Sequence, residues 1–201
     1  MCIRDRQLVE SGSIFQTSSD TEIILQLVAR SKKKKIIDKL IDTLRQIQGA
    51  YSLVILTNKK LIGVRDPFGI RPLVLGDKNG SPVLASETCA LDMIGAKYVR
   101  DIENGEIVVI TESGMESIKP FKKIAERPCI FERIYFASPD SIVGNKTVYT
   151  YRKALGEHLA IENNLIADVV VPIPDSGVSA AIGFSQKSKI PFELGIIRSH
   201  Y

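Results

Sequence analysis

The sequence predicts a mixed fold, an α+β domain followed by the beginning of an α/β domain. Helical patterns give way to a series of short strand patterns in the first part of the chain, as is typical of sheets covered by helices. A strand, a loop, a helix and a second strand follow one another over residues 168–197, which is the order of a βαβ unit. Residues 120–128, with two prolines and several charged residues, separate these two patterns.

The first part begins with an apolar segment at residues 12–16, which we expect to be a strand. Hydroxyl and acidic residues at 17–22 form a helix-start signature, and apolar residues then recur at helical spacing up to Val28. A second helix pattern runs over residues 36–47 and is ended by Gly49. We therefore expect a strand followed by two helices.

Shorter elements follow in both parts of the chain. Asn104-Gly105, a strong turn dipeptide, separates two of the expected strands. The alternation of apolar and polar residues and the positions of turn residues predict each boundary. The expected elements are strands at 51–57, 61–65 and 82–86, a helix at 87–94, strands at 99–102 and 106–111, a helix at 149–163, a strand at 168–172, a helix at 178–187 and a strand at 192–197.

The composition is that of a globular protein and identifies no partner. Of 201 residues, 44% are hydrophobic and 25% are charged, which is enough apolar material to bury a core. The net charge is only +4, and the one dense basic run, residues 32–35, has no interleaved aromatic residues. We interpret this run as a solvated surface, and we expect no nucleic-acid partner.

Apolar runs and cysteines also exclude several classes of protein. No apolar run approaches the roughly 20 residues of a membrane helix, so we expect no membrane partner. Three scattered cysteines fit neither a disulfide framework nor a CxxC zinc site. This cysteine usage favours a reducing compartment, and we expect a cytoplasmic protein.

Residues 169–177, Val-Val-Val-Pro-Ile-Pro-Asp-Ser-Gly, are the most informative for mechanism. In open α/β sheets, ligands bind beyond the carboxyl ends of strands, where the N–H groups of a helix N-terminus favour phosphate. Asp175 and Ser176 add hard oxygen ligands of the kind that Mg²⁺ accepts beside a substrate phosphate. The alternative is an ordinary loop in which one of these two side chains caps the helix.

Two further segments allow both a functional and a structural interpretation. Residues 65–73, Arg-Asp-Pro-Phe-Gly-Ile-Arg-Pro-Leu, form either an anion site or a rigid bend stabilised by internal bonds of Arg65, Asp66 and Arg71. The residue types alone favour the bend. Asp20 either receives a substrate ammonium group or caps the helix that follows it, and the residue types again favour the structural role.

Cysteines and histidines give no catalytic set. Cys129 lies between apolar neighbours, where a lone cysteine is typical of a small buried hydrophobe, and a metal-binding role would need distant partners. His158 falls on an expected helix and His200 lies at the end of the sequence. No Ser-His-Asp or Cys-His arrangement is visible.

Taken together, six strings of the sequence resemble the amidophosphoribosyltransferase family. Each is moderately specific, and all six follow the order of the family. They are Ser-Ser-Asp-Thr-Glu at 18–22, the segment 65–73, Ala-Ser-Glu at 85–87, Cys-Ile-Phe-Glu at 129–132, Tyr-Phe-Ala with Pro-Asp-Ser at 135–141, and Pro-Ile-Pro-Asp-Ser-Gly at 172–177. The resemblance begins at about residue 7, and we interpret residues 1–6 as a non-native prefix.

The resemblance implies a fold and an activity. Residues 7–124 would be part of a type 2 glutamine amidotransferase domain, an N-terminal-nucleophile αββα sandwich, and residues 125–201 the N-terminal part of a phosphoribosyltransferase domain. In the family, ammonia from glutamine displaces pyrophosphate from phosphoribosylpyrophosphate, with Mg²⁺, to give 5-phosphoribosylamine, the first committed step of purine synthesis. The family further implies a homotetramer and feedback inhibition by purine nucleotides.

Two alternatives stay open beside this reading. One is a non-catalytic regulator that binds phosphoribosylpyrophosphate. The other is a different type 2 glutamine amidotransferase, against which the Pro-Asp-Ser-Gly segment argues.

The resemblance also implies roles for single residues. Asp20 matches the aspartate that holds the α-amino group of glutamine. Asp175 lies in the phosphoribosylpyrophosphate site beside Ser176, which matches a Mg²⁺-binding position. Arg198 to Tyr201 match the start of a loop that closes over that substrate. Cys129 matches one ligand of a [4Fe-4S] cluster, which one subgroup of the family carries.

Several features depart from the family. Its nucleophile is a Cys followed by Gly at the start of the mature chain, whereas Cys2 is followed by Ile3 and Arg4, so we assign no catalytic residue. The Asn-Gly oxyanion hole is missing between Cys2 and Asp20. Ser138 stands where the family usually has Arg. The Asp-Asp-Ser substrate loop would follow Tyr201, so we expect an interior fragment that is inactive by itself.

Overall fold

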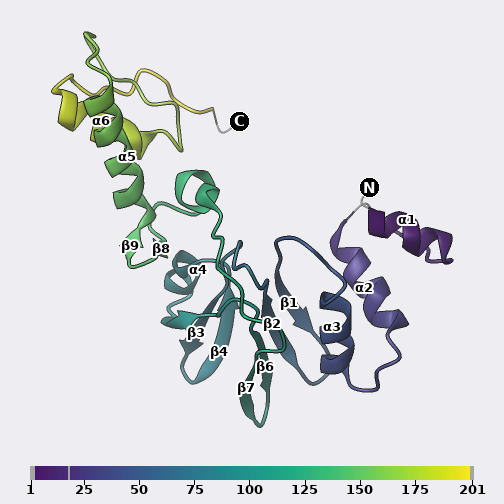
Figure 1. The fold of residues 1–201 in the computed structure, drawn as a ribbon. Coiled ribbons are helices and arrows are strands. Elements are labelled where there is room, and N and C mark those ends of the chain that lie inside the picture. The colour runs from purple at the N-terminus through teal and green to yellow at the C-terminus, as the bar shows by residue number, and fades with distance from the viewer. Residues whose placement is uncertain (1–2, 18, 200–201) are drawn as a thin grey trace. The chain divides into compact units, whose positions relative to one another are not determined.

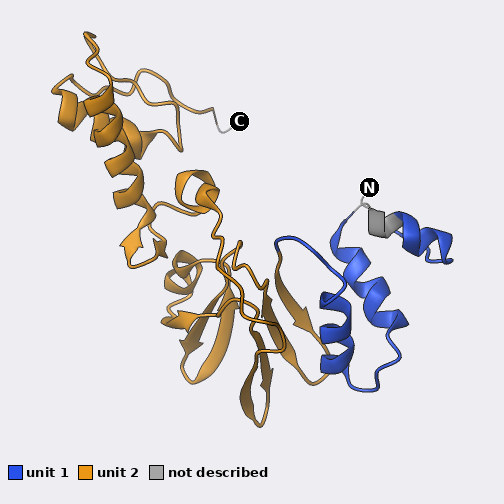
Figure 2. Cartoon of the chain, in the orientation of Figure 1, with its two compact units in different colours: residues 1–50 blue, residues 51–201 orange. Residues whose placement is uncertain are grey.

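The computed structural model describes residues 3–17 and 19–199, which divide into two compact units. Residues 1–50 belong to the first unit and residues 51–201 to the second (Figure 2). The boundary between the units, after residue 50, does not coincide with the domain boundaries suggested by the sequence, after residues 6 and 124. Those domain boundaries stay predictions. No helix within 3–17 and 19–199 is long and apolar enough to cross a membrane.

Three helices make up the first unit: α1 (Ile3–Glu10), α2 (Thr21–Arg30) and α3 (Ile36–Leu44) (Figure 1). Leu8 of α1 packs with Ile23 and Leu27 of α2, and this cluster is the core of the unit. Helices α2 and α3 confirm the two helical patterns of the sequence. Helix α1 was not expected, and it begins within the six residues that we interpreted as a prefix.

The strand expected at residues 12–16 is wrong, because this segment has no regular structure. Its backbone completes the end of α1 instead of joining a sheet. Gly12 N–H donates to the carbonyl oxygen of Val9 (2.9 Å), and Ser13 N–H donates to that of Leu8 (2.9 Å). Phe15 packs against the helical core, so its apolar character serves helix packing.

Two antiparallel sheets form the centre of the second unit (Figure 1). The first has the order β1-β2-β6-β7, with β1 (Ser52–Leu56), β2 (Leu61–Arg65), β6 (Ile107–Thr111) and β7 (Gly114–Ile118). The second has the order β4-β3-β5, with β4 (Ser81–Ala85), β3 (Val74–Lys78) and β5 (Lys97–Asp101). The expected β1–β2 hairpin is confirmed, whereas β3 and β7 were not expected.

Alternation along β3 explains the layers of this unit. Leu75 joins a buried cluster with Ile102 and Val108, so the two sheets pack face to face. Val74, its neighbour, points to the opposite face and packs with Leu91 of helix α4 (Thr88–Met93). The unit is therefore layered as sheet, sheet and helix, which agrees with the mixed fold class expected from the sequence.

After an irregular segment that includes the expected break at 120–128, most of the regular structure is helical. A π-helical turn, η1 (Glu132–Phe136), precedes a two-stranded hairpin, β8 (Ile142–Val143) and β9 (Lys146–Thr147). Helix α5 (Val148–Glu162) follows directly and confirms the helix expected at 149–163.

The βαβ order is confirmed around helix α6 (Val178–Ser188). Val170, before the helix, and Phe192, after it, form a parallel bridge. The two expected strands at 168–172 and 192–197 are nevertheless reduced to this one bridge.

Helices α5 and α6 approach each other closely. A Cβ atom on Gly156 of α5 would overlap the carbonyl oxygen of Ala180, and one on Gly183 of α6 would overlap that of Lys153. The two helices therefore pack backbone against backbone, and only glycine is tolerated at these two positions.

Candidate functional site

Asp20 lies at the start of α2 with its side chain exposed. It occupies the N-cap position, yet its backbone is helical (φ −63°, ψ −23°) and its side chain makes no capping hydrogen bond. The capping role considered for Asp20 is therefore not used in this structure. The carboxylate is free of that role and accessible to a cationic group of a ligand.

Glu22 performs the local structural role instead. Its carboxylate accepts hydrogen bonds from Gln16 N–H and Thr17 N–H, both at 2.9 Å, and from Thr17 Oγ1 at 2.7 Å. The hydrogen bond from Gln16, followed by those from Thr17, lowers the pKa of Glu22. Glu22 thus ties the incoming chain to the first turn of α2 and fixes the segment that carries Asp20.

The Pro-Asp-Ser-Gly loop leads from Val170 into α6. Gly177 is the N-cap residue, so neither Asp175 nor Ser176 caps the helix. Gly177 N–H donates to the carbonyl oxygen of Ile173 (3.0 Å), and a Cβ on Gly177 would lie 2.7 Å from that same oxygen. Glycine is required for this tight turn, which presents Asp175 and Ser176 as exposed side chains.

Asp175 and Arg198, two predicted substrate-binding residues, are close in space. Arg198 Nη1 lies 3.0 Å from Asp175 Oδ2, and both side chains are largely exposed. An exposed pair of this kind contributes little stability, about 0–1 kcal/mol, so a ligand can replace it readily. Tyr201, the third predicted contact, lies outside the described residues.

Cys129 is half-buried and free. Its N–H donates to the carbonyl oxygen of Ile70 (3.1 Å), and its own carbonyl oxygen accepts from Glu132 N–H (3.2 Å). Within residues 3–17 and 19–199, no three His, Cys, Asp or Glu residues are grouped to hold a metal ion. A cluster ligand role for Cys129 therefore stays a prediction.

The segment 65–73 is a bend stabilised from within, as the residue types favoured. Asp66 is fully buried, and its carboxylate accepts from Phe68 N–H (2.9 Å) and Ile70 N–H (3.1 Å). Arg65 donates to the carbonyl oxygens of Arg71 (2.9 Å) and Ile102 (2.8 Å). Because backbone N–H groups occupy the carboxylate of Asp66, this side chain is not available to a ligand.

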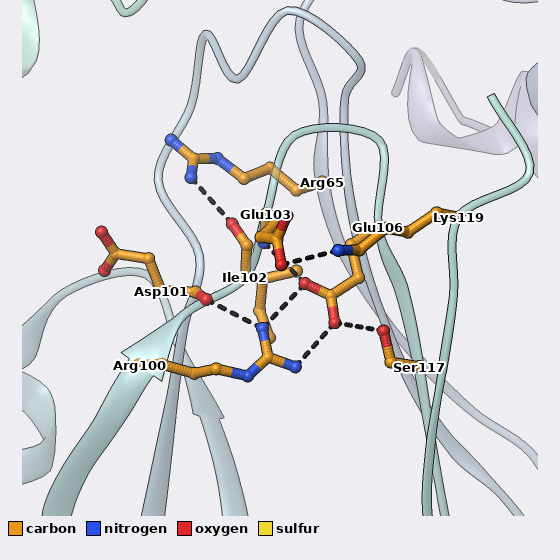
Figure 3. A network of polar contacts seen from close by, with 8 residues as sticks. All are labelled: Arg65, Arg100, Asp101, Ile102, Glu103, Glu106, Ser117 and Lys119. Carbon is orange, nitrogen blue, oxygen red and sulfur yellow. Dashed lines mark hydrogen bonds and ion pairs between the residues drawn. The ribbon is translucent and has the colours of Figure 1, made fainter. Parts of the chain in front are cut away.

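A second polar network connects residues of the two sheets (Figure 3). Arg100 of β5 donates two hydrogen bonds to the fully buried Glu106, at 2.8 and 2.6 Å, and Ser117 of β7 donates a third at 2.7 Å. Burial opposes ionisation of Glu106, but these hydrogen bonds outweigh it and lower its pKa to about 2. This network joins the two sheets and was not recognised in the sequence.

Three further charged residues that the sequence did not single out connect distant segments. Glu132 is buried and pairs with Arg71 at 2.7 Å. Glu87, in the Ala-Ser-Glu string, accepts from Ser138 N–H at 2.7 Å. Arg152 of α5 is 4% exposed. Glu132 and Glu87 belong to short motifs and Arg152 does not, but the partners of all three lie far away in the sequence and could not be identified there.

A family model described as a glutamine amidotransferase domain matches residues 4–93. An amidophosphoribosyltransferase of Rhizobium etli is 54% identical and aligns with 98% of this chain and 40% of its own length. The corresponding Bacillus subtilis protein is 44% identical and aligns with 98% of this chain and 41% of its own length.

A solved structure agrees. It is described as glutamine phosphoribosylpyrophosphate amidotransferase from B. subtilis complexed with ADP and GMP, and it superimposes with a TM-score of 0.93 at 43% identity. That match covers 98% of this chain and 44% of the solved chain. Over this length, the chain is similar to amidophosphoribosyltransferases in both sequence and fold. It spans about 40% of the length of the curated relatives that it matches.

Proposed function

We propose that this chain is a segment of an enzyme that makes 5-phosphoribosylamine from glutamine and phosphoribosylpyrophosphate, the first committed step of purine synthesis. The observation that carries the proposal is the match of 98% of the chain, in both sequence and fold, to amidophosphoribosyltransferases. The exposed side chains of Asp20, Asp175 and Ser176 support it. A different type 2 amidotransferase or a non-catalytic regulator has no comparable support.

In this proposal, Asp20 binds the α-amino group of glutamine. Its carboxylate is exposed and makes no capping bond, so an ammonium group can reach it from solvent. Glu22 positions Asp20 by holding residues 16 and 17 against α2. The nucleophile is not assigned to any residue, and Cys2 lies outside the described residues.

Asp175 and Arg198 would bind phosphoribosylpyrophosphate. The start of a helix favours anions through its N–H groups and its dipole, and Arg198 adds a positive charge at the same loop. Binding would exchange the exposed Asp175–Arg198 pair for contacts with the substrate. Tyr201 is proposed as a further contact from the same part of the chain.

The loop also fits Mg²⁺. This ion usually binds one or two protein oxygens together with substrate phosphates, and Asp175 and Ser176 present hard oxygen atoms on one exposed turn. We assign Ser176 as the ligand. A bound Mg²⁺ would neutralise charge on the leaving pyrophosphate.

A [4Fe-4S] cluster does not fit the residues of the described part. Such a cluster takes four cysteine thiolates, whereas only Cys89 and Cys129 are present in residues 3–17 and 19–199. Cys129 as a cluster ligand would therefore require thiolates from a longer protein.

Regulation and location follow the family as further parts of the proposal. The B. subtilis structure contains ADP and GMP, which supports purine nucleotides as feedback inhibitors. We also propose a homotetramer and a cytoplasmic location, although several plant relatives are described as chloroplastic.

Complementation in a chimeric enzyme tests the proposed function. This chain would replace the matching segment of the B. subtilis amidophosphoribosyltransferase, and the chimera would be expressed in a strain that lacks this enzyme and needs purines. We expect growth without purines, and loss of growth with Ser176→Ala. Asp168→Asn, an exposed carboxylate ahead of the same loop, is the matched control. Failure of the folded, unmodified chimera to support growth would contradict the proposal.

A further inference from the structure

Glu87 joins two segments that are far apart in the sequence. It precedes α4 but makes no capping bond to that helix. Its Oε2 atom instead accepts hydrogen bonds from Ser138 N–H (2.7 Å) and Ser141 Oγ (2.8 Å). The adjacent Thr88 Oγ1 accepts from Ile142 N–H (2.8 Å). The start of α4 therefore holds the whole turn at residues 138–142.

These bonds are partly shielded from water. Ser141 is fully buried and Thr88 is 6% exposed. Hydrogen bonds to a carboxylate are stronger than neutral ones, and a buried hydroxyl that lost its partner would be costly to leave unpaired. The bond from Ser138 comes from its backbone N–H, so it does not depend on which side chain stands at that position.

The same turn anchors the start of α5. Val148 N–H donates to the carbonyl oxygen of Ser141 (2.9 Å), and Tyr149 N–H donates to that of Pro139 (2.7 Å). The first N–H groups of a helix have no partner within the helix, so the turn supplies what α5 lacks. A change in the position of the turn would move or unravel this end of the helix.

Arg152 and Arg71 hold the neighbouring segment in place. Arg152 donates from α5 to the carbonyl oxygens of Arg133 (2.9 Å) and Ala137 (2.8 Å), at either end of the π-helical turn. Arg71 pairs with Glu132 in that turn and lies 4.7 Å from the centre of the Phe136 ring. The link between the bend at 65–73, the π-helical turn and α5 is therefore built from buried charge and backbone oxygens.

From α5 the contacts continue to the proposed substrate loop. Gly156 and Gly183 leave no side-chain layer between α5 and α6, so a displacement of one helix is passed directly to the other. Helix α6 begins at Gly177, in the loop that carries Asp175 and Ser176.

We propose that Glu87 is a positioning residue: its carboxylate fixes the turn at 138–142, the turn fixes the start of α5, and α5 in turn fixes α6 and its leading loop. The clamp formed by Glu87, Thr88 and the turn at 138–142 is independent of the proposed function. Only its effect on substrate binding at Asp175 and Ser176 rests on that function.

Hydrogen exchange of the 201-residue chain tests the clamp. In Glu87→Ala, we expect the amides of the turn and of α5 and α6 to exchange about tenfold faster or more, since a lost charged hydrogen bond of this kind exceeds 1.4 kcal/mol. Amides of β1, β2 and β6 should change much less. Glu112→Ala removes an exposed carboxylate from the β6–β7 turn and should leave the pattern unchanged.

Two further variants keep the test decisive if Glu87→Ala does not fold. Ser141→Ala leaves the carboxylate in place and should speed exchange in the same segments, whereas Glu87→Gln keeps an acceptor oxygen and should restore part of the protection. Unchanged exchange in α5 would overturn the proposal, and so would acceleration by an equal factor in the sheets and in α5.

The consequence for the substrate loop has its own readout. In the chimeric enzyme, Glu87→Gln should raise KM for phosphoribosylpyrophosphate about threefold or more and leave kcat for glutamine hydrolysis unchanged. An unchanged KM beside altered exchange would contradict only the effect on the loop. If the unmodified chimera had no activity while Glu87→Ala still altered exchange in the 201-residue chain, the proposed function would be contradicted. The clamp would then still stand.

Discussion

Glu106 and Glu132 are both buried carboxylates of the second unit, but their surroundings act on them in opposite directions. Glu106 receives two hydrogen bonds from Arg100 and one from Ser117, as well as a backbone N–H bond from Glu103 (2.7 Å) (Figure 3). Its pKa falls to about 2 despite burial. Its negative charge is therefore stabilised by the folded state.

Glu132 has fewer partners. Burial raises its pKa, the negative charge of Glu87 raises it further, and only the pairing with Arg71 acts in the other direction. Burial alone thus does not determine whether a carboxylate stabilises the fold; the number of donors directed at it does. The hydrogen bonds of Glu106 connect the two sheets and stabilise its charge. Glu132 connects the π-helical turn to Arg71 with fewer donors, so its charge is less well stabilised.

Of the changes to these two carboxylates, removal of Glu106 is expected to lower the stability of the fold most. Glu106→Ala leaves Arg100 without its buried partner and should lower the free energy of unfolding by about 4 kcal/mol. Denaturant titration measures this loss. Glu116→Ala, on the exposed face of β7, is the matched control and should change stability by less than about 0.5 kcal/mol. A small effect of Glu106→Ala would mean that the network is not a joint.

The second largest effect on stability is expected from acid, through protonation of Glu106. Because its folded pKa is lower than the ordinary value of 4.5, it stabilises the fold above about pH 4.5, and this contribution is lost as the pH falls toward 2. The loss should be on the order of 3 kcal/mol. Comparing the unfolding free energies of the protein and of Glu106→Gln between pH 6 and pH 2 isolates this contribution. The gap between the two should close with acid, and a constant gap would contradict the assigned pKa.

Glu132→Gln should have the smallest effect, about 1 kcal/mol or less at neutral pH, because Arg71 is partly exposed and can be hydrated. The sign of the pH dependence is opposite to that of Glu106. A raised pKa favours folding when Glu132 is protonated, and this advantage is lost as the pH rises through the folded pKa. The protein should therefore lose stability relative to Glu132→Gln between pH 4 and pH 8, and a relative gain would contradict this account.

Local patterns predicted much of the fold. Apolar periodicity and turn residues, both signals between residues close together in the sequence, predicted several elements correctly. These are the hairpin of β1 and β2, the Asn104-Gly105 turn, and helices α2, α3, α5 and α6. The missed strands lack such a signal. Strand β3 is interrupted by Gly76, and β7, the edge strand of its sheet, is mostly exposed and has no run of apolar residues.

The candidate site was predicted less completely. Asp20, Asp175 and Ser176 lie in short motifs and could be named from the sequence, whereas Glu87 and Glu106 depend on partners that only folding brings near. Glu87 accepts from a residue 51 positions away, and no spacing rule connects the two. The sequence also favoured Asp20 as a helix cap. The hydrogen bonds by which Glu22 holds residues 16 and 17 at the start of α2 become visible only in the folded structure.

The most direct test of the proposed function is the rate of phosphoribosylamine formation by the chimeric enzyme, measured separately with glutamine and with ammonia. Asp20→Asn should abolish the glutamine-dependent reaction and leave the ammonia-dependent reaction nearly unchanged, whereas Ser176→Ala should impair both. Asp168→Asn should impair neither. A glutamine-dependent rate that survives Asp20→Asn, or an equal loss of both reactions in that variant, would contradict the assignment of this chain to the two sites.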